Sequence, residues 1–246
     1  MDPDYRRFLK ADDWDLRGQV VSDQQKRMPY PPLEEPPPLD APQFDLPDPE
    51  ASMLGEMPVR EVIRRRQSHR DFRAEPLTLE ELAYLCWATQ GVRAVAASGA
   101  ALLRTVPSGG SRHPFETYLA VRNVASLTPG LYRYLSLSHR LCLLRPGDLT
   151  AEAVAACRGQ RMVALCAVLF VWAAVPYRTE WRYPLVAAKL IAQDSGHVCA
   201  HLYLACESIG AGCCAVGAYD QAKMDAFIGL DGERMFCVYA APVGKV

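Results

Sequence analysis

Helix-like and strand-like segments predict an α+β protein with one main domain and an N-terminal extension. Half of the 246 residues are apolar, which is enough for a sizeable core. Helical and strand patterns are mixed without the regular alternation of a parallel βαβ protein. Eleven of the nineteen prolines occur before residue 60. We therefore divide the chain into an extension, residues 1–56, and a folded domain, residues 57–246.

The extension contains too much proline to form a regular helix, because proline fixes φ and lacks an amide hydrogen. Two interpretations remain open: a disordered tail, or an arm that lies across the folded domain. Apolar residues recur along the segment and favour the arm. Its expected anchors are Leu33, Phe44 and Leu46.

The first half of the folded domain predicts two helices and three strands. VREVIRRR predicts a short helix from Val59, and a second helix should begin at Thr78, where Thr78 and Glu81 form a capping box, and end at Gly91. Residues 92–106 are small and irregular and predict a loop. ETYLAVRNV predicts a strand, and residues 130–145 predict a hairpin.

The second half predicts two helices and three more strands. A helix is expected at 149–158, followed by a buried strand over the apolar residues 162–175. A long helix at 185–209 is apolar almost all round, which is typical of burial on both sides in a core or a subunit interface. CCAVGAYD and RMFCVYAAPVG predict the last strands, and the nearly continuous apolar run of the second predicts a central position.

Charge and composition exclude several classes of function. A net charge of −1 provides no general field for nucleic acid or an anionic membrane. The longest apolar run has 14 residues, whereas a membrane helix needs about 20, and the charged N-terminus does not resemble a signal peptide. The nine cysteines form no CxxC pair and are expected to be free thiols in a reducing compartment. We therefore expect a cytoplasmic protein without nucleic-acid or membrane partners.

An arginine-rich block, RRRQSHRDF at residues 64–72, is the first candidate binding motif. Arg66, Arg70 and the Ser68 hydroxyl could hold phosphate oxygens, since guanidinium groups pair with phosphate through two parallel hydrogen bonds. The alternative is a solvated basic turn.

The second candidate motif is the loop PSGGS. Pro107 fixes a turn, while Gly109 and Gly110 leave the backbone without side chains, so Ser108, Ser111 and the exposed amides can bind a flat polar ring.

Other sites are less well supported by the sequence. No GK[ST] follows the glycine loop, and GAGCCAVG follows a helix and precedes a strand, the reverse of a Rossmann turn. His197 and His201 are four residues apart and could bind a metal with Asp194, but HExxH is absent and no third ligand is evident. We expect hydrogen bonds between helices there and no metal. Serine-hydrolase chemistry is not expected, because there is no GxSxG motif.

Six blocks, in order over about residues 58–245, resemble the nitroreductase-like flavoproteins, specifically the SagB-type (ThcOx) dehydrogenase branch. They are RRRQSHRDF, LTLEELAYLCWATQGV, RTVPSGGSRHPFETYLAV, PGLYRYLSLSHRL, DSGHVCAHLYLACESIGAG and YAAPVGK. The resemblance implies a central, mostly antiparallel sheet wrapped by helices, in a domain-intertwined homodimer with FMN at the interface. The arm is then expected to lie on the partner subunit.

The resemblance also assigns the cofactor site. It implies that the arginine block holds the FMN phosphate and the polar edge of the flavin, and that PSGGS contacts the FMN of the partner subunit. It also implies that the backbone of the turn at Val216 and Gly217 faces flavin N5. The implied FMN-binding residues are Arg66, Gln67, Ser68, Arg70, Pro107, Ser108, Gly109, Gly110, Ser111, Val216, Gly217 and Lys245.

Three positions depart from the family pattern. Gln67 stands where a second basic residue is usual, and Ser111 where typical nitroreductases have asparagine. Lys245 is a weak substitute for the family's C-terminal basic segment.

The candidate catalytic residues are Arg182 and Tyr183, which occupy the place of a Lys–Tyr pair in azoline-oxidising members. An arginine remains protonated and is a poor general base, but it can hold an anionic substrate. The alternative is that Tyr183 packs an access loop with Arg182 in solvent. The expected function is an FMN-dependent oxidoreductase that transfers hydride between flavin N5 and a small organic substrate, with NAD(P)H as candidate donor. The alternative is a redox-inactive, flavoprotein-like binding or scaffold protein.

Overall fold

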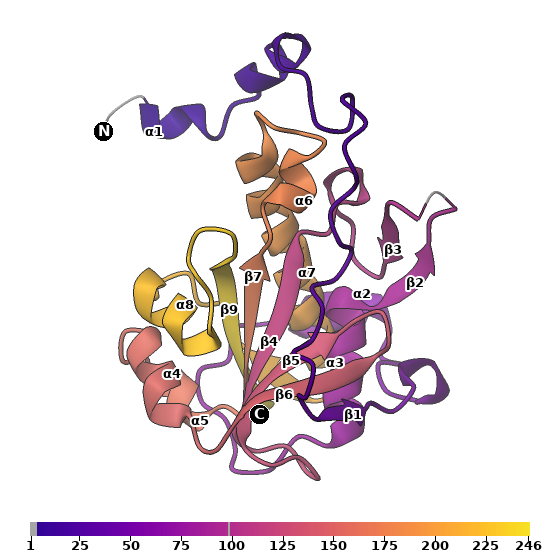
Figure 1. The fold of residues 1–246 in the computed structure, drawn as a ribbon. Coiled ribbons are helices and arrows are strands. Elements are labelled where there is room, and N and C mark those ends of the chain that lie inside the picture. The colour runs from indigo at the N-terminus through magenta and orange to yellow at the C-terminus, as the bar shows by residue number, and fades with distance from the viewer. Residues whose placement is uncertain (1–3, 98) are drawn as a thin grey trace.

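A seven-stranded antiparallel sheet forms the centre of the protein in a computed structural model that describes residues 4–97 and 99–246 (Figure 1). The order of its strands is β1-β6-β5-β4-β7-β9-β8, and every neighbouring pair is antiparallel. The predicted α+β class and antiparallel sheet are confirmed. The strands are β1 (Gln43–Asp45), β2 (Val92–Val95), β3 (Leu102–Arg104), β4 (Phe115–Val121), β5 (Gly130–Leu135), β6 (Arg140–Pro146), β7 (Val168–Ala174), β8 (Ala211–Cys213) and β9 (Phe236–Lys245).

Helices cover both faces of this sheet, as Figure 1 shows. On one face α3 and α7 pack on the strands around Trp172 and Leu202, and on the other face α4, α5 and α8 pack around Val171 and Met224. The helices are α1 (Asp4–Arg7), α2 (Val59–Arg65), α3 (Leu79–Gln90), α4 (Thr150–Ala156), α5 (Arg161–Leu165), α6 (Tyr177–Glu180), α7 (Ala187–Ser208) and α8 (Gln221–Ile228). None of these helices is long and apolar enough to cross a membrane.

Local signals fix several helix ends. The capping box is present at α3: the Glu81 amide donates to Thr78 Oγ1 at 3.1 Å, and the Thr78 amide donates to Glu81 Oε2 at 2.9 Å. Helix α8 begins after Asp220, whose carboxylate accepts from the Lys223 amide at 3.1 Å, and ends at Gly229 with φ of 77°. Helix α8 was not predicted from the sequence.

Four predicted elements were wrong in detail. Residues 92–106 are not only a loop, because β2 and β3 pair there. The apolar run 162–175 begins with α5, and its strand, β7, starts only at Val168. Strand β8 ends at Cys213, so most of CCAVGAYD is not a strand. Strand β9 is paired on both sides but lies next to the edge strand β8, whereas β4 is central.

The last part of the arm is ordered on the sheet of its own chain. Its last part, β1, pairs with β6, and Leu46 is buried, whereas Leu33 is only half-buried and Phe44 is more exposed, with its ring edge-on to Tyr132. The chain thus adds a strand to its own sheet, which covers the edge of β6.

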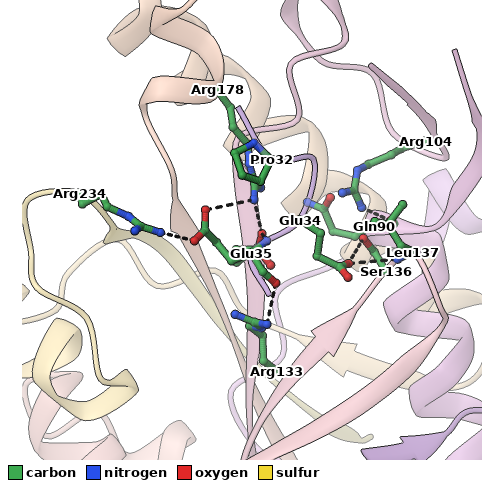
Figure 2. Close-up of polar contacts among 11 residues, drawn as sticks. Pro32, Glu34, Glu35, Gln90, Arg104, Arg133, Ser136, Leu137, Arg178 and Arg234 are labelled. Atoms are coloured by element: carbon green, nitrogen blue, oxygen red, sulfur yellow. Dashed lines mark hydrogen bonds and ion pairs between the residues drawn. The ribbon is translucent and has the colours of Figure 1, made fainter. Parts of the chain in front are cut away.

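Two glutamates attach the arm to the body, Glu35 through arginines and Glu34 through Ser136 and Leu137 (Figure 2). Glu35 lies between Arg178 of α6 and Arg234, and its carbonyl accepts from Arg133 of β5 at 2.8 Å. The Glu35 amide donates to Glu116 Oε1 at 2.9 Å, and Arg178 Nη2 contacts the same oxygen at 2.5 Å. Ser136 donates to Glu34 at 2.8 Å. Side-chain charge, rather than apolar anchors alone, therefore holds the arm.

Candidate flavin site

Helix α2 ends in the arginine block, and the four arginines of the block differ in their contacts. Arg64 and Arg65 each contact Glu61 Oε1 at 2.5 Å, one turn earlier on the helix. These hydrogen bonds lower the pKa of Glu61 to about 2. Arg66 follows the helix and Arg70 lies beyond it, and both are exposed. The cations that remain available for an anion are therefore those of Arg66 and Arg70.

Tyr203 of α7 connects this block to the turn after β8. Its hydroxyl lies 3.0 Å from Ser68 Oγ and accepts from the Ala215 amide at 2.8 Å, while the Arg66 guanidinium lies over its ring at 5.4 Å from the centroid. The His69 amide also donates to the Cys213 carbonyl at 3.0 Å. The basic block and the turn, about 150 residues apart in sequence, thus form one surface.

Within that turn, Val216 and Gly217 differ. The Val216 amide donates to the Ala240 carbonyl at 2.7 Å, so its backbone is used in a bridge to β9. Gly217 is exposed, and a Cβ placed there would meet only Tyr239, at 3.9 Å. The open backbone of the turn is therefore that of Gly217.

The glycine loop is held from the opposite side of α7, by Asp194. Ser108 Oγ donates to Asp194 Oδ2 at 2.6 Å, the Gly109 amide donates to Oδ1 at 3.1 Å, and the His113 amide donates to Ser108 Oγ at 2.9 Å. Burial raises the pKa of Asp194, although its hydrogen bonds with Ser108 and Gly109 oppose the rise. Gly110 has φ of 63°, a conformation that favours glycine.

Tyr183 lies against this loop. A Cβ on Gly110 would come within 2.5 Å of the Tyr183 hydroxyl, so glycine is required there for the close approach. Arg182 lies over the ring of Tyr183 at 5.2 Å, and the ring of Trp14 is edge-on to it at 5.9 Å. Arg112 donates to the Gly110 carbonyl at 3.1 Å. The candidate catalytic pair and the glycine loop are thus neighbours.

The remaining predicted residues lie apart from these two clusters or make no close contact with them. Lys245 forms an ion pair with Glu81 at the start of α3, and both side chains are largely buried. Gln67 and Pro107 are exposed, and Ser111, which is half-buried, donates its amide to the Ser108 carbonyl at 3.0 Å. The ammonium of Lys245 is therefore engaged within the protein.

Helix α7 separates the two clusters. Asp194 and Tyr203 are nine residues apart, which corresponds to about 14 Å along the axis and two and a half turns. They consequently lie on opposite sides of the helix. One chain alone does not bring the basic block and the glycine loop to the same place.

No metal site is evident in the described part of the chain. No group of three or more histidine, cysteine or acidic side chains comes together there. His201 Nδ1 lies 3.2 Å from the Ala88 carbonyl of α3, and His197 Nδ1 lies 3.7 Å from Asp194. Three cavities of about 590, 410 and 420 Å³ occur elsewhere, and none is lined by a predicted site residue.

Sequence reasoning missed the two side chains of α7 that organise the site. Tyr203 lies in an apolar run with no local signal of its contacts. Asp194 was noted only as a possible companion of His197. Its real partners, Ser108 and Gly109, are more than 80 residues away, and only the pairing of a buried acid with a glycine loop could have suggested them.

The fold and these two clusters define an antiparallel α+β protein with a basic block and a glycine loop on opposite sides of one helix. Residues 63–245 match the family model described as the Nitroreductase family. A relative from Methanocaldococcus jannaschii, named "Putative nitroreductase MJ1384", is 30% identical over 180 residues, which cover 73% of this chain and 86% of the relative. The chain therefore belongs to the nitroreductase family, a family of flavin-dependent oxidoreductases.

Solved structures agree on the fold. A crystal structure titled as a "putative nitroreductase" from Ralstonia eutropha JMP134 has a TM-score of 0.68 and 27% identity. The match covers 89% of this chain and 99% of that chain. The Escherichia coli microcin synthetase McbBCD complex has a TM-score of 0.62 at 16% identity, and the match covers 100% of this chain and 94% of that chain. The NADPH:FMN oxidoreductase from Vibrio harveyi, complexed with NAD+, has a TM-score of 0.53 at 19% identity, with coverage of 76% and 68%. The last two show the fold alone.

Proposed function

We propose that this protein is a homodimeric, FMN-dependent oxidoreductase that transfers hydride between flavin N5 and a small organic substrate, with NAD(P)H as the electron donor. The observation that carries the proposal is the surface around Tyr203, where exposed arginines lie next to the turn after β8 with its exposed Gly217. Family membership and the similarity in fold to an NADPH:FMN oxidoreductase support it.

The residues around Tyr203 fit a flavin mononucleotide. Arg66 and Arg70 are exposed cations that Glu61 does not neutralise, and Ser68 adds a hydroxyl beside Arg66. This donor set suits the phosphate. Gly217, with no side chain over its backbone, can accept the edge of a flat ring. When bound, FMN supplies the N5 atom that accepts and donates hydride.

In this proposal the glycine loop of the second cluster contacts the FMN of the partner subunit, and Arg182 and Tyr183 beside it form the substrate side. Asp194 fixes the glycine loop, and Tyr183 lies against Gly110 with Arg182 over its ring. Tyr183 can donate a hydrogen bond or a proton to the substrate, and Arg182 can hold a carboxylate or a developing oxyanion. Arg182 Nε is buried and has no hydrogen-bond partner among the described residues.

A homodimer would unite the two clusters, since they lie on opposite sides of α7 within one chain. The exposed stripe of α7 includes the small residues Gly196 and Ala200, and a Cβ on Gly196 would meet no atom within 4 Å. Such a stripe permits close approach of a second subunit. We also assign the chain to the SagB-type branch, on the six sequence blocks in order.

The test of this function is the double variant Arg66→Ala, Arg70→Ala. Each charge-assisted hydrogen bond contributes about 1.5–3 kcal/mol, so loss of both should weaken FMN binding by about 100-fold or more. The control is Arg64→Ala, Arg65→Ala, which removes the same charge from the same block but only at the two arginines paired with Glu61. Binding is measured by quenching of flavin fluorescence, and subunit number by light scattering.

Three outcomes would contradict the proposal. Wild-type protein that does not bind FMN would favour the redox-inactive scaffold. Equal FMN affinity in the two double variants would show that Arg66 and Arg70 do not form the phosphate site. A stable monomer that retains FMN would contradict the shared site.

A further inference from the structure

The Tyr203 side chain contacts both the arginine block and the turn after β8. It is half-buried on α7, and its hydroxyl oxygen lies between Ser68 Oγ, at 3.0 Å, and the amide nitrogen of Ala215, at 2.8 Å. Burial raises its pKa, so the phenol keeps its proton at neutral pH. The three groups therefore form a chain of hydrogen bonds whose direction can be worked out.

The direction follows from the donor and acceptor capacity of each group. The Ala215 amide can only donate, so the Tyr203 oxygen accepts from it. The phenolic proton then needs an acceptor, and Ser68 Oγ is within reach at 3.0 Å. When Ser68 accepts from Tyr203, its own proton is free to point outward. Either hydroxyl can donate in the Ser68–Tyr203 pair. When Tyr203 donates, the exposed Ser68 hydroxyl can donate toward solvent, beside the Arg66 cation.

We infer that Tyr203 is a positioning residue that turns the Ser68 hydroxyl outward as a donor to the phosphate of the cofactor and ties that donor to the turn at Gly217. This inference rests on the proposed FMN-binding function. Arg66 contributes to the same arrangement, because its guanidinium lies over the Tyr203 ring at 5.4 Å and is kept next to Ser68. Tyr203 itself need not touch the cofactor.

The test is Tyr203→Phe, measured with two ligands, FMN and riboflavin, which lacks the phosphate. The variant should bind FMN about 3- to 10-fold more weakly, the range for one hydrogen bond, and riboflavin with unchanged affinity. Ser68→Ala should show the same selective loss, and the double variant should lose no more than either single variant, because both act on one interaction.

The matched control is Tyr84→Phe. Tyr84 of α3 likewise has its hydroxyl next to a serine, 3.2 Å from Ser208 Oγ on α7, but it lies outside both motifs. The Tyr84→Phe variant should leave the affinities for FMN and for riboflavin unchanged. Thermal unfolding of each variant shows whether it is folded, and if Tyr203→Phe is not, the selective loss in Ser68→Ala still tests the outward donor.

Equal losses for FMN and riboflavin in Tyr203→Phe would overturn the inference in favour of a purely structural role. Unchanged FMN affinity in either single variant would also overturn it, as would a double variant whose loss is the product of the two single losses. In each of these cases the wild type still binds FMN, so the proposed function stands. If the wild type binds neither FMN nor riboflavin, the proposed FMN-dependent function is wrong, and the inference about Tyr203 is wrong with it.

Discussion

Glu116 is the buried charge on which the attachment of the arm depends. Its side chain is 3% exposed and contacts Arg178, 2% exposed, at 2.5 Å. It also accepts from the amide of Glu35 in the arm at 2.9 Å. Glu116→Gln preserves the shape and one acceptor but removes the negative charge. Arg178 would then remain a buried cation whose nearest carboxylate is that of Glu35, at 3.9 Å.

The expected loss of stability follows from that burial. Removing one partner of a buried ion pair costs about 3–5 kcal/mol, because the other charge stays buried without compensation. Glu35 offsets part of this cost, so we expect about 3 kcal/mol. With a urea dependence of roughly 2–3 kcal/mol per molar, the midpoint of unfolding should fall by about 1 M.

Urea unfolding followed by circular dichroism, at one protein concentration, measures the effect. The control is Glu152→Gln, which makes the same chemical change in the exposed pair Arg145–Glu152, at 2.8 Å. Exposed pairs contribute about 0–1 kcal/mol, so its midpoint should barely move. Limited proteolysis should also cut the arm of Glu116→Gln sooner. If both variants show the same small shift, burial does not decide the strength of this pair and the reasoning is wrong.

Two other predictions concern pH and catalysis. Burial is the largest cause, and repulsion from Arg104 the second, of the lowered pKa of His113, which is about 3. Because this pKa is below the unfolded value of about 6.5, the contribution of neutral His113 to stability is full above pH 6.5. The free energy of unfolding falls by up to about 1.4 kcal/mol per pH unit between pH 6.5 and 3. His113→Asn, which tolerates the φ of 44° at this position, should lose less stability between pH 7 and 5 in urea unfolding, and an identical loss would remove His113 as the cause. Tyr183→Phe and Arg182→Ala should slow turnover, on the order of 100-fold for a lost general acid, with unchanged flavin content. NAD(P)H oxidation with quinone and nitroaromatic acceptors measures this, and wild-type rates in both variants would leave these residues without a role.

The sequence was most informative where a local signal specifies an element. The capping box at Thr78 correctly predicted the start of α3, and the apolar pattern predicted α7 within two residues at each end. Helix α8 could also have been found, since Asp220 and Gly229 are ordinary cap residues. The run 162–175 misled because a buried helix and a buried strand are equally apolar, and only the sheet decides that α5 precedes β7.

Long-range contacts explain what the sequence did not reveal about the site. The basic block and the glycine loop were recognised as motifs, but their supports, Tyr203 and Asp194, act across 135 and 86 residues. No local signal marks Glu35 within the proline-rich stretch. Its partners are arginines on β5, on α6 and just before β9, which the fold alone brings to the arm.

The arm also has a consequence for the order in which the protein assembles during synthesis. Glu35 leaves the ribosome early, yet Glu116 follows 81 residues later and Arg234 199 residues later. At a translation rate of about 5–20 residues per second, the arm must therefore wait about 10 s or longer for the last of its partners. This early segment is therefore among the last to be fixed. During that interval its prolines, which disfavour both helix and sheet pairing, help to keep the arm from competing structures.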